Sequence, residues 1–127
     1  MFRRGFSPFA CVFSRGSTTE RFFPTSIAVP TSAVKAVRAM MEVLNLTADL
    51  RLKFAFQESD DREVWPATFT LLAGSGTNVD GYFPGDTYET LTLTKAWVRF
   101  GVVTKNDSAG TKYEFAWVSM RFDTRAC

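Results

Sequence analysis

Apolar and polar residues alternate with a period of two along much of the chain. In residues 49–59, DLRLKFAFQES, one face of the alternation carries Leu50, Leu52, Phe54 and Phe56, and the other carries Arg51, Lys53, Ala55 and Gln57. An alternation of this kind is typical of a strand that packs one face against a core and turns the other to water. The stretch therefore predicts a half-buried strand.

Shorter stretches of the same character predict the neighbouring elements. Strands are expected at 63–72, 87–94, 95–103 and 111–122, with a turn at 58–61 and a long loop of turn-forming residues at 73–86. Pro66 has no backbone N–H, so the strand at 63–72 is expected at a sheet edge or with a bulge.

Residues 32–46 fit two patterns at once. Apolar residues at 34, 37, 41 and 44 recur at helical spacing behind a capping Thr31 or Ser32. Apolar residues at 37, 39, 41 and 43 also alternate, as they would in a strand. The β character of the following sequence favours the strand, and a short helix stays open.

The last two predicted strands, 95–103 and 111–122, flank the turn-forming segment KNDSAG and are expected to form a hairpin. With its turn centred on Ser108, Arg99 would lie opposite Trp117 and Gly101 opposite Phe115. A guanidinium over an indole would stabilise the hairpin by ~0.5–1 kcal/mol. The expected core face of the hairpin carries Ala96, Val98, Phe100, Val102, Ala116, Val118, Met120 and Phe122.

Several short strands joined by turns predict an all-β fold. The expected architecture is an antiparallel β-sandwich or jelly roll over residues 31–127, with at most one short helix. An extended N-terminal arm and link, 1–30, would precede it. The chain has 127 residues, of which 46% are hydrophobic, enough for a core of its own.

The arm combines aromatic and basic residues. Its phenylalanines are Phe2, Phe6, Phe9, Phe13, Phe22 and Phe23, and its arginines include Arg3, Arg4 and Arg15. Burial of one phenylalanine is worth ~1.5–3 kcal/mol, so these side chains are expected to pack either on their own sandwich or on a neighbouring subunit.

The outer face of the predicted hairpin is also aromatic. It carries Trp97, Arg99, Phe115, Trp117 and Arg121, where a solvent-facing sheet would show polar residues. Trp and Arg are frequent in protein–protein hot spots. Together with the nine arm residues named above, these five form the expected interface, covered either by the chain itself or by a partner.

Charge and residue types narrow the function. The net charge is only +2, because the first 23 residues carry +3 and the remainder −1. A nearly neutral domain argues against nucleic-acid binding by the folded body but leaves a weak nucleic-acid contact by the arm open. The chain has no histidine and no phosphate-binding glycine motif, so we expect no enzyme and no cofactor. Cys11 and Cys127 are expected as unpaired thiols, with a link between subunits as the less favoured alternative.

Two further features receive the simpler interpretation. Asn78, Asp80, Asp86 and Glu89 could gather a calcium ion, but their Asp-Gly and Gly-Asp pairs are ordinary turn formers, so no metal is expected. The sequence shows no uninterrupted apolar run typical of a signal peptide or a membrane helix. No membrane partner is therefore expected.

The stretch FQESDDREVW, residues 56–65, resembles part of the discoidin-like sandwiches through Gln57, Ser59, Asp60, Asp61 and Trp65. The resemblance implies a module that binds sugars or lipids through loops at one end of the sandwich. The chain lacks the cysteine pair that usually closes those domains. The strand–turn–strand pattern is also similar in general style to small β-sandwich structural proteins of phage and phage-like particles.

These observations favour a structural subunit of a larger assembly, either a capsid-type shell or a decoration protein. Its expected partners are further copies of itself, as a homo-oligomer, and other structural proteins. Its expected location is a virion or similar particle, and otherwise the cytoplasm. The alternative is a discoidin-like carbohydrate-binding module, which would bind through Trp97, Trp117 or the 73–86 loop.

Overall fold

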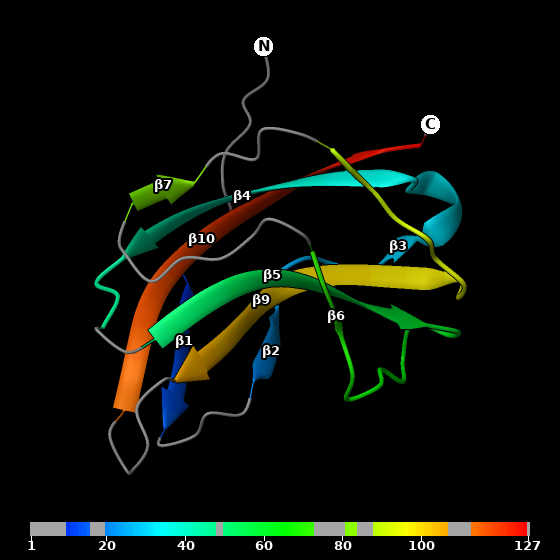
Figure 1. Cartoon of the computed structure of the whole chain (residues 1–127). Coiled ribbons are helices and arrows are strands. Elements are labelled where there is room, and N and C mark those ends of the chain that lie inside the picture. The colour runs from blue at the N-terminus through cyan, green and yellow to red at the C-terminus, as the bar shows by residue number, and fades with distance from the viewer. Residues whose placement is uncertain are drawn as a thin grey trace.

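The computed structural model describes residues 10–15, 20–47, 50–72, 81–83, 88–106 and 113–126. These residues form two antiparallel sheets packed face to face (Figure 1). The order in sheet A is β1 (Ala10–Arg15), β10 (Tyr113–Arg125), β4 (Ala36–Leu44) and β7 (Gly81–Phe83), with β8 (Glu89–Thr90) also on β4. The order in sheet B is β2 (Arg21–Pro24), β9 (Trp97–Asn106), β5 (Leu50–Ser59) and β6 (Thr70–Leu71), with β3 (Val29–Pro30) also on β9. The predicted all-β antiparallel sandwich is confirmed.

The ambiguous segment after residue 31 is a strand. A single 3-10 turn, η1 (Thr31–Ala33), precedes β4, which pairs with β10 on one side and with β7 and β8 on the other. Pairing on both sides satisfies the backbone and outweighs the helical preference of its Ala and Met residues.

The predicted hairpin is wrong, because β9 and β10 belong to different sheets. Arg99 lies opposite Gln57 of β5, whereas Trp117 lies opposite Cys11 of β1 and Leu44 of β4. Alternation fixes which face of a strand is apolar but says nothing about which strand lies beside it. The Arg99–Trp117 and Gly101–Phe115 pairings therefore do not exist.

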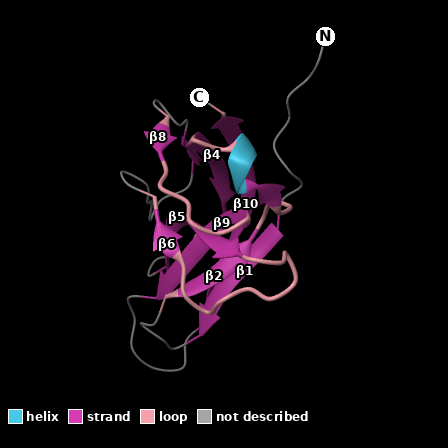
Figure 2. Ribbon diagram, turned by 90° about the vertical axis from the view of Figure 1, so that its right-hand side faces the viewer, coloured by secondary structure: helices cyan, strands magenta, loops and turns pink. Residues whose placement is uncertain are grey.

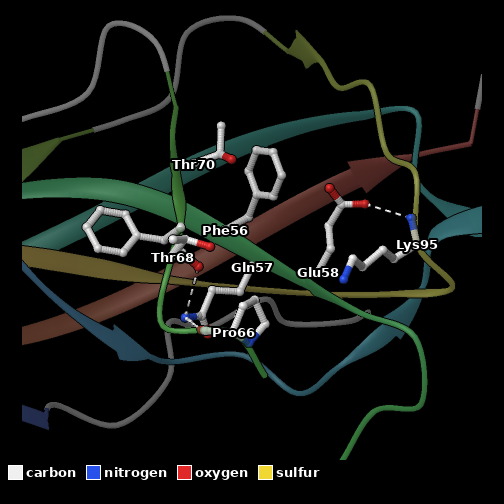
Figure 3. A pocket seen from close by; sticks show the side chains of 8 residues that line it. Phe56, Gln57, Glu58, Pro66, Thr68, Thr70 and Lys95 are labelled. Carbon is white, nitrogen blue, oxygen red and sulfur yellow. Dashed lines mark hydrogen bonds between the residues drawn. The ribbon is translucent and has the colours of Figure 1, made fainter. Parts of the chain in front are cut away.

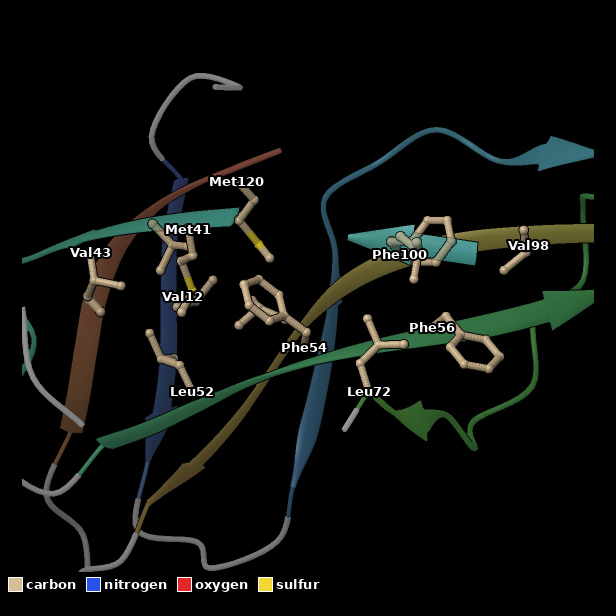
Figure 4. Close-up of a cluster of buried hydrophobic side chains, with 14 of the residues drawn as sticks. Val12, Met41, Val43, Leu52, Phe54, Phe56, Leu72, Val98, Phe100 and Met120 are labelled. Atoms are coloured by element: carbon tan, nitrogen blue, oxygen red, sulfur yellow. The ribbon is translucent and has the colours of Figure 1, made fainter. Parts of the chain in front are cut away.

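The predicted core faces nevertheless hold, because the two strands face each other across the sandwich. Phe100 of β9 and Met120 of β10 are at most 3% exposed and point into one cluster between the sheets (Figure 4). The Phe100 ring stacks on Phe122 with centroids 5.1 Å apart. Ala96, predicted in the core, is exposed because β9 begins one residue later. The other members of the predicted core faces that are buried are Leu50, Leu52, Phe54, Phe56, Val98, Val102, Ala116 and Val118.

The described part of the segment 1–30 lies within the sandwich. β1 is the edge strand of sheet A and β2 the edge strand of sheet B, and they lie close together in both views (Figures 1 and 2). The Phe13 and Phe23 rings meet there edge to face at 5.7 Å, and the Arg21 guanidinium lies over both. Residues Phe2, Arg3, Arg4, Phe6 and Phe9 lie outside the described residues, and so does the nucleic-acid contact expected of them.

Two predicted strands are much shorter than expected. In 63–72 only Thr70–Leu71 pairs with β5, and among the described residues 88–94 only Glu89–Thr90 pairs with β4. The loop at 73–86 contains β7, while Asn78, Asp80 and Asp86 lie outside the described residues. Within the described ranges no helix is long and apolar enough to cross a membrane.

Candidate functional site

A loop of the chain itself covers part of the outer face of sheet B. Residues 60–69, which follow β5, fold back over that sheet and bury Gln57 to 5% exposure, although the sequence predicted it in solvent. The Gln57 amide Nε2 donates to the carbonyl oxygen of Pro66 at 2.8 Å (Figure 3). Ala55, on the same face, is fully buried. The prediction that this face is open to water is therefore wrong at both positions.

A tight turn after β5 directs this loop. The Ser59 hydroxyl donates to the Val64 carbonyl at 2.6 Å, and Asp61 Oδ1 accepts the N–H groups of Glu63 and Val64, both at 2.9 Å. The N–H groups of Val64 and Glu63 lower the pKa of Asp61 because they stabilise its charged form. The predicted turn at 58–61 is thus built by hydrogen bonds of Ser59 and Asp61.

Aromatic rings and arginines fill the space under this loop. The Arg99 guanidinium lies 4.3 Å from the centroid of Trp65, and the Arg62 guanidinium lies 4.7 Å from that of Trp97. Phe22 of β2 stacks on Phe69 with centroids 5.9 Å apart. Three predicted interface residues, Phe22, Trp97 and Arg99, therefore make their aromatic contacts within their own chain.

An exposed aromatic surface lies instead on the outer face of sheet A. Phe13, Leu44, Phe115 and Trp117 are each 38–43% exposed. Large apolar side chains that are exposed side by side are uncommon on protein surfaces. Trp117 stands between Cys11 and Leu44 in the strand register, and Phe13 stands opposite Phe115. These four residues and the exposed Cys11 are together called the sheet A patch.

The structure thus divides the predicted interface between two sheets. Phe13, Phe115 and Trp117 come together in the sheet A patch, and Phe23 is half-buried beside the core. Only the backbone of Arg15 is described, as the last residue of β1. Leu44 was not predicted as an interface residue. The strand pattern could have indicated it, because Leu44 lies on the outer face of β4 with Arg38 and Glu42, opposite to the core positions 37, 41 and 43.

Further along the same face, Arg38 and Arg121 bind the Asp123 carboxylate, and Arg125 lies with Arg38 at the Tyr88 ring. Asp123 accepts hydrogen bonds from Arg38 at 2.8 Å and from Arg121 at 3.0 and 3.2 Å. The Arg38 and Arg125 guanidiniums lie 5.0 and 4.2 Å from the ring centroid of Tyr88. Partial burial would raise the pKa of Asp123, but the hydrogen bonds and charges of Arg121 and Arg38 lower it overall. Arg38, Arg121 and Arg125 are called the arginine cluster.

A small hollow lies at the edge of β5, between the loop at 66–70 and Lys95 (Figure 3). Its volume is about 210 Å³, below the range of about 300–1,000 Å³ that small-molecule sites occupy. Glu58 on its rim already accepts the N–H groups of Thr94 and Lys95, at 2.7 and 2.9 Å. The geometry offers a structural role for this carboxylate, since it fixes the chain that leads into β9.

Comparisons with known proteins agree with the architecture. No family model matches the chain, and no curated protein matches it. The sandwich is similar in fold to VP2 of infectious bursal disease virus. VP2 in its subviral particle superposes with a TM-score of 0.58 at 11% identity, over 94% of this chain and 31% of VP2. The structure of the Gt strain of that virus gives a TM-score of 0.54 at 12% identity, over 94% of this chain and 31% of the other. At these identities the likeness concerns the fold, and this chain spans about a third of the chains it matches.

Proposed function

We propose that this protein is a structural subunit of a viral or virus-like particle, and that it contacts a neighbouring copy of itself through the sheet A patch. The observation that carries the proposal is the patch itself. Four large apolar side chains on neighbouring strands are each 38–43% exposed. Contiguous apolar surface of this kind marks interaction sites, and Trp is prominent among residues that dominate such contacts.

Two observations support this functional class. The fold is similar to that of VP2, which was solved as a subviral particle. The second aromatic cluster, under the loop at 60–69, is used to hold the chain's own structure. The arginines there meet Trp65 and Trp97 within the subunit. Among the described residues, this leaves the sheet A patch as the aromatic surface on which a neighbour would gain the most from excluding water.

The test is the mass of the protein in solution. Light scattering at two concentrations is expected to show a defined oligomer for the natural sequence and a monomer for the double variant Leu44→Ser, Trp117→Ser. Ile27→Ser is the matched control, because Ile27 is 82% exposed but lies between β2 and β3, away from the patch. A natural protein that stays monomeric, or a patch variant that assembles normally, would overturn the proposal.

Carbohydrate binding stays as the alternative, because the exposed Trp117 and Phe115 rings could stack on sugars. Trp97 is a weaker candidate for this role, since the Arg62 guanidinium already lies over its ring. The alternative expects a monomer that binds glycans saturably and loses that binding in Trp117→Ser. The same set of variants therefore separates the two functions.

A further inference from the structure

The charged surfaces of the subunit suggest which part of a neighbouring copy reaches the outer face of sheet A. The arginine cluster lies on that face, beyond the sheet A patch along β10. Lys35 precedes β4 beside it, and its backbone N–H donates to the backbone carbonyl oxygen of Arg125. Lys35 and Arg125 are both exposed. Against these four basic residues stand three acidic ones: Asp123, which accepts from two of them, Glu42 on the same face of β4, and Glu89 of the neighbouring β8. The surface is therefore basic on balance.

The turn after β5 has the opposite character. Asp60, Asp61 and Glu63 are exposed there, and the Asp60 carboxylate keeps 79% of its side-chain surface with only a 3.6 Å contact to Lys95. The one basic residue of the turn, Arg62, is directed to Trp97. Val64 adds an apolar side chain that is 72% exposed. An exposed acidic turn that ends in an exposed apolar residue is thus held in place by the Ser59 and Asp61 hydrogen bonds.

We infer that the acidic turn Asp60–Val64 of one copy docks on the arginine cluster and Lys35 of the next. This inference rests on the proposed function and names the partner surface for the same sheet face. Opposite charges favour the encounter and fix its orientation. The turn extends from sheet B while the cluster lies on sheet A, so each copy carries both halves of the contact. Contacts between two different surfaces can repeat from copy to copy and build rings or shells.

The experiment uses two charge-reversal variants of the full chain. The turn variant is Asp60→Lys, Glu63→Lys, which spares Asp61 and so keeps the hydrogen bonds of the turn. The cluster variant is Lys35→Glu, Arg125→Glu, which spares the Arg38–Asp123 and Arg121–Asp123 pairs. Each variant alone is expected to lose the oligomer in light scattering, because like charges then face each other. An equimolar mixture is expected to regain it, because each variant meets its complement in the other.

Glu20→Lys is the control, since this reversal lies on sheet B beside Lys53, outside both surfaces, and is expected to keep the oligomer. The natural oligomer should also weaken as salt rises from about 0.1 M to 1 M, where the Debye length falls from about 10 Å to 3 Å.

If both variants assemble as the natural protein does while the Leu44, Trp117 variant does not, the inference fails and the proposed function stands. A mixture that stays monomeric overturns the pairing of the two surfaces. If the cluster variant alone loses binding to a single-stranded oligonucleotide and keeps its oligomer, the basic surface serves nucleic acid and the inference is wrong.

Discussion

Arg99 and Gln57 lie directly opposite each other on β9 and β5, and two guanidinium nitrogens of Arg99 donate to the same amide oxygen. The distances to Gln57 Oε1 are 3.0 Å from Nε and 2.7 Å from Nη2. The other end of the amide donates to the Pro66 carbonyl, and Trp65 covers the guanidinium. One glutamine side chain therefore joins the strand pair to the loop that covers sheet B.

Replacing this amide should cost stability. Gln57→Ala leaves the partly buried Arg99 guanidinium without this acceptor, and we expect the free energy of unfolding to fall by about 1–3 kcal/mol. Urea denaturation followed by tryptophan fluorescence measures it. Lys53→Ala, on the same face of β5 but more exposed, is the control and should change stability by less than about 0.5 kcal/mol. Equal effects of the two substitutions would show that the Gln57 network contributes little.

Position 101 is expected to tolerate no residue other than glycine. A Cβ at this position would clash with the backbone carbonyl of Phe23 and would lie 2.7 Å from Cζ of Phe22. Gly101→Ala should therefore destabilise the protein by about 1–3 kcal/mol and lower its Tm. Shortening Phe22 in the same chain should not restore the Tm, because the nearest obstacle belongs to the backbone of β2. A full recovery in Gly101→Ala, Phe22→Ala would contradict this explanation.

Low pH should weaken the ion pairs that Asp123 forms with Arg38 and Arg121. The pKa of Asp123 in the folded protein is lower than its ordinary value of 3.8. Its contribution to stability is therefore fully present above pH 3.8 and is lost as the pH falls through the lower folded pKa. We expect Asp123→Asn to be less stable than the natural protein by about 1 kcal/mol at pH 7, and the difference to shrink toward pH 2. Denaturation from pH 7 to pH 2 measures this, with the neighbouring Thr124→Ala as the non-titrating control. A difference that is constant over this range would rule out the predicted role of the Asp123 charge.

The Cys11 thiol offers a direct probe of the sheet A patch. It is exposed and lies opposite Trp117 in the register of β1 and β10. In a Cys127→Ser background, which leaves one thiol, assembly should slow its reaction with a thiol reagent at least tenfold. The monomeric Leu44→Ser, Trp117→Ser variant should react at the fast rate at every concentration. Equal rates in oligomer and monomer would place Cys11, and with it the patch, outside the interface.

Part of the candidate site could be anticipated. Phe13, Phe115 and Trp117 were predicted as interface residues, because alternation places the latter two away from the core. Their meeting on one surface could not be predicted, since β1 and β10 are about a hundred residues apart in the chain. That Arg38 and Arg121 share the carboxylate of Asp123 could not be predicted either, because this depends on the register between β4 and β10.

Sequence by itself determined the β class and the inward faces of the long strands. Phe54, Phe100 and Val118 are buried as their alternation required, since a period of two leaves one face of each strand apolar wherever it pairs. Only the tertiary structure decided that β9 and β10 lie in different sheets and that residues 10–15 and 21–24 pair with them. It also decided that a loop buries Gln57 on a face that the pattern assigned to water. Strand partners and loop coverage depend on contacts between distant segments, and the local order of apolar and polar residues does not encode them.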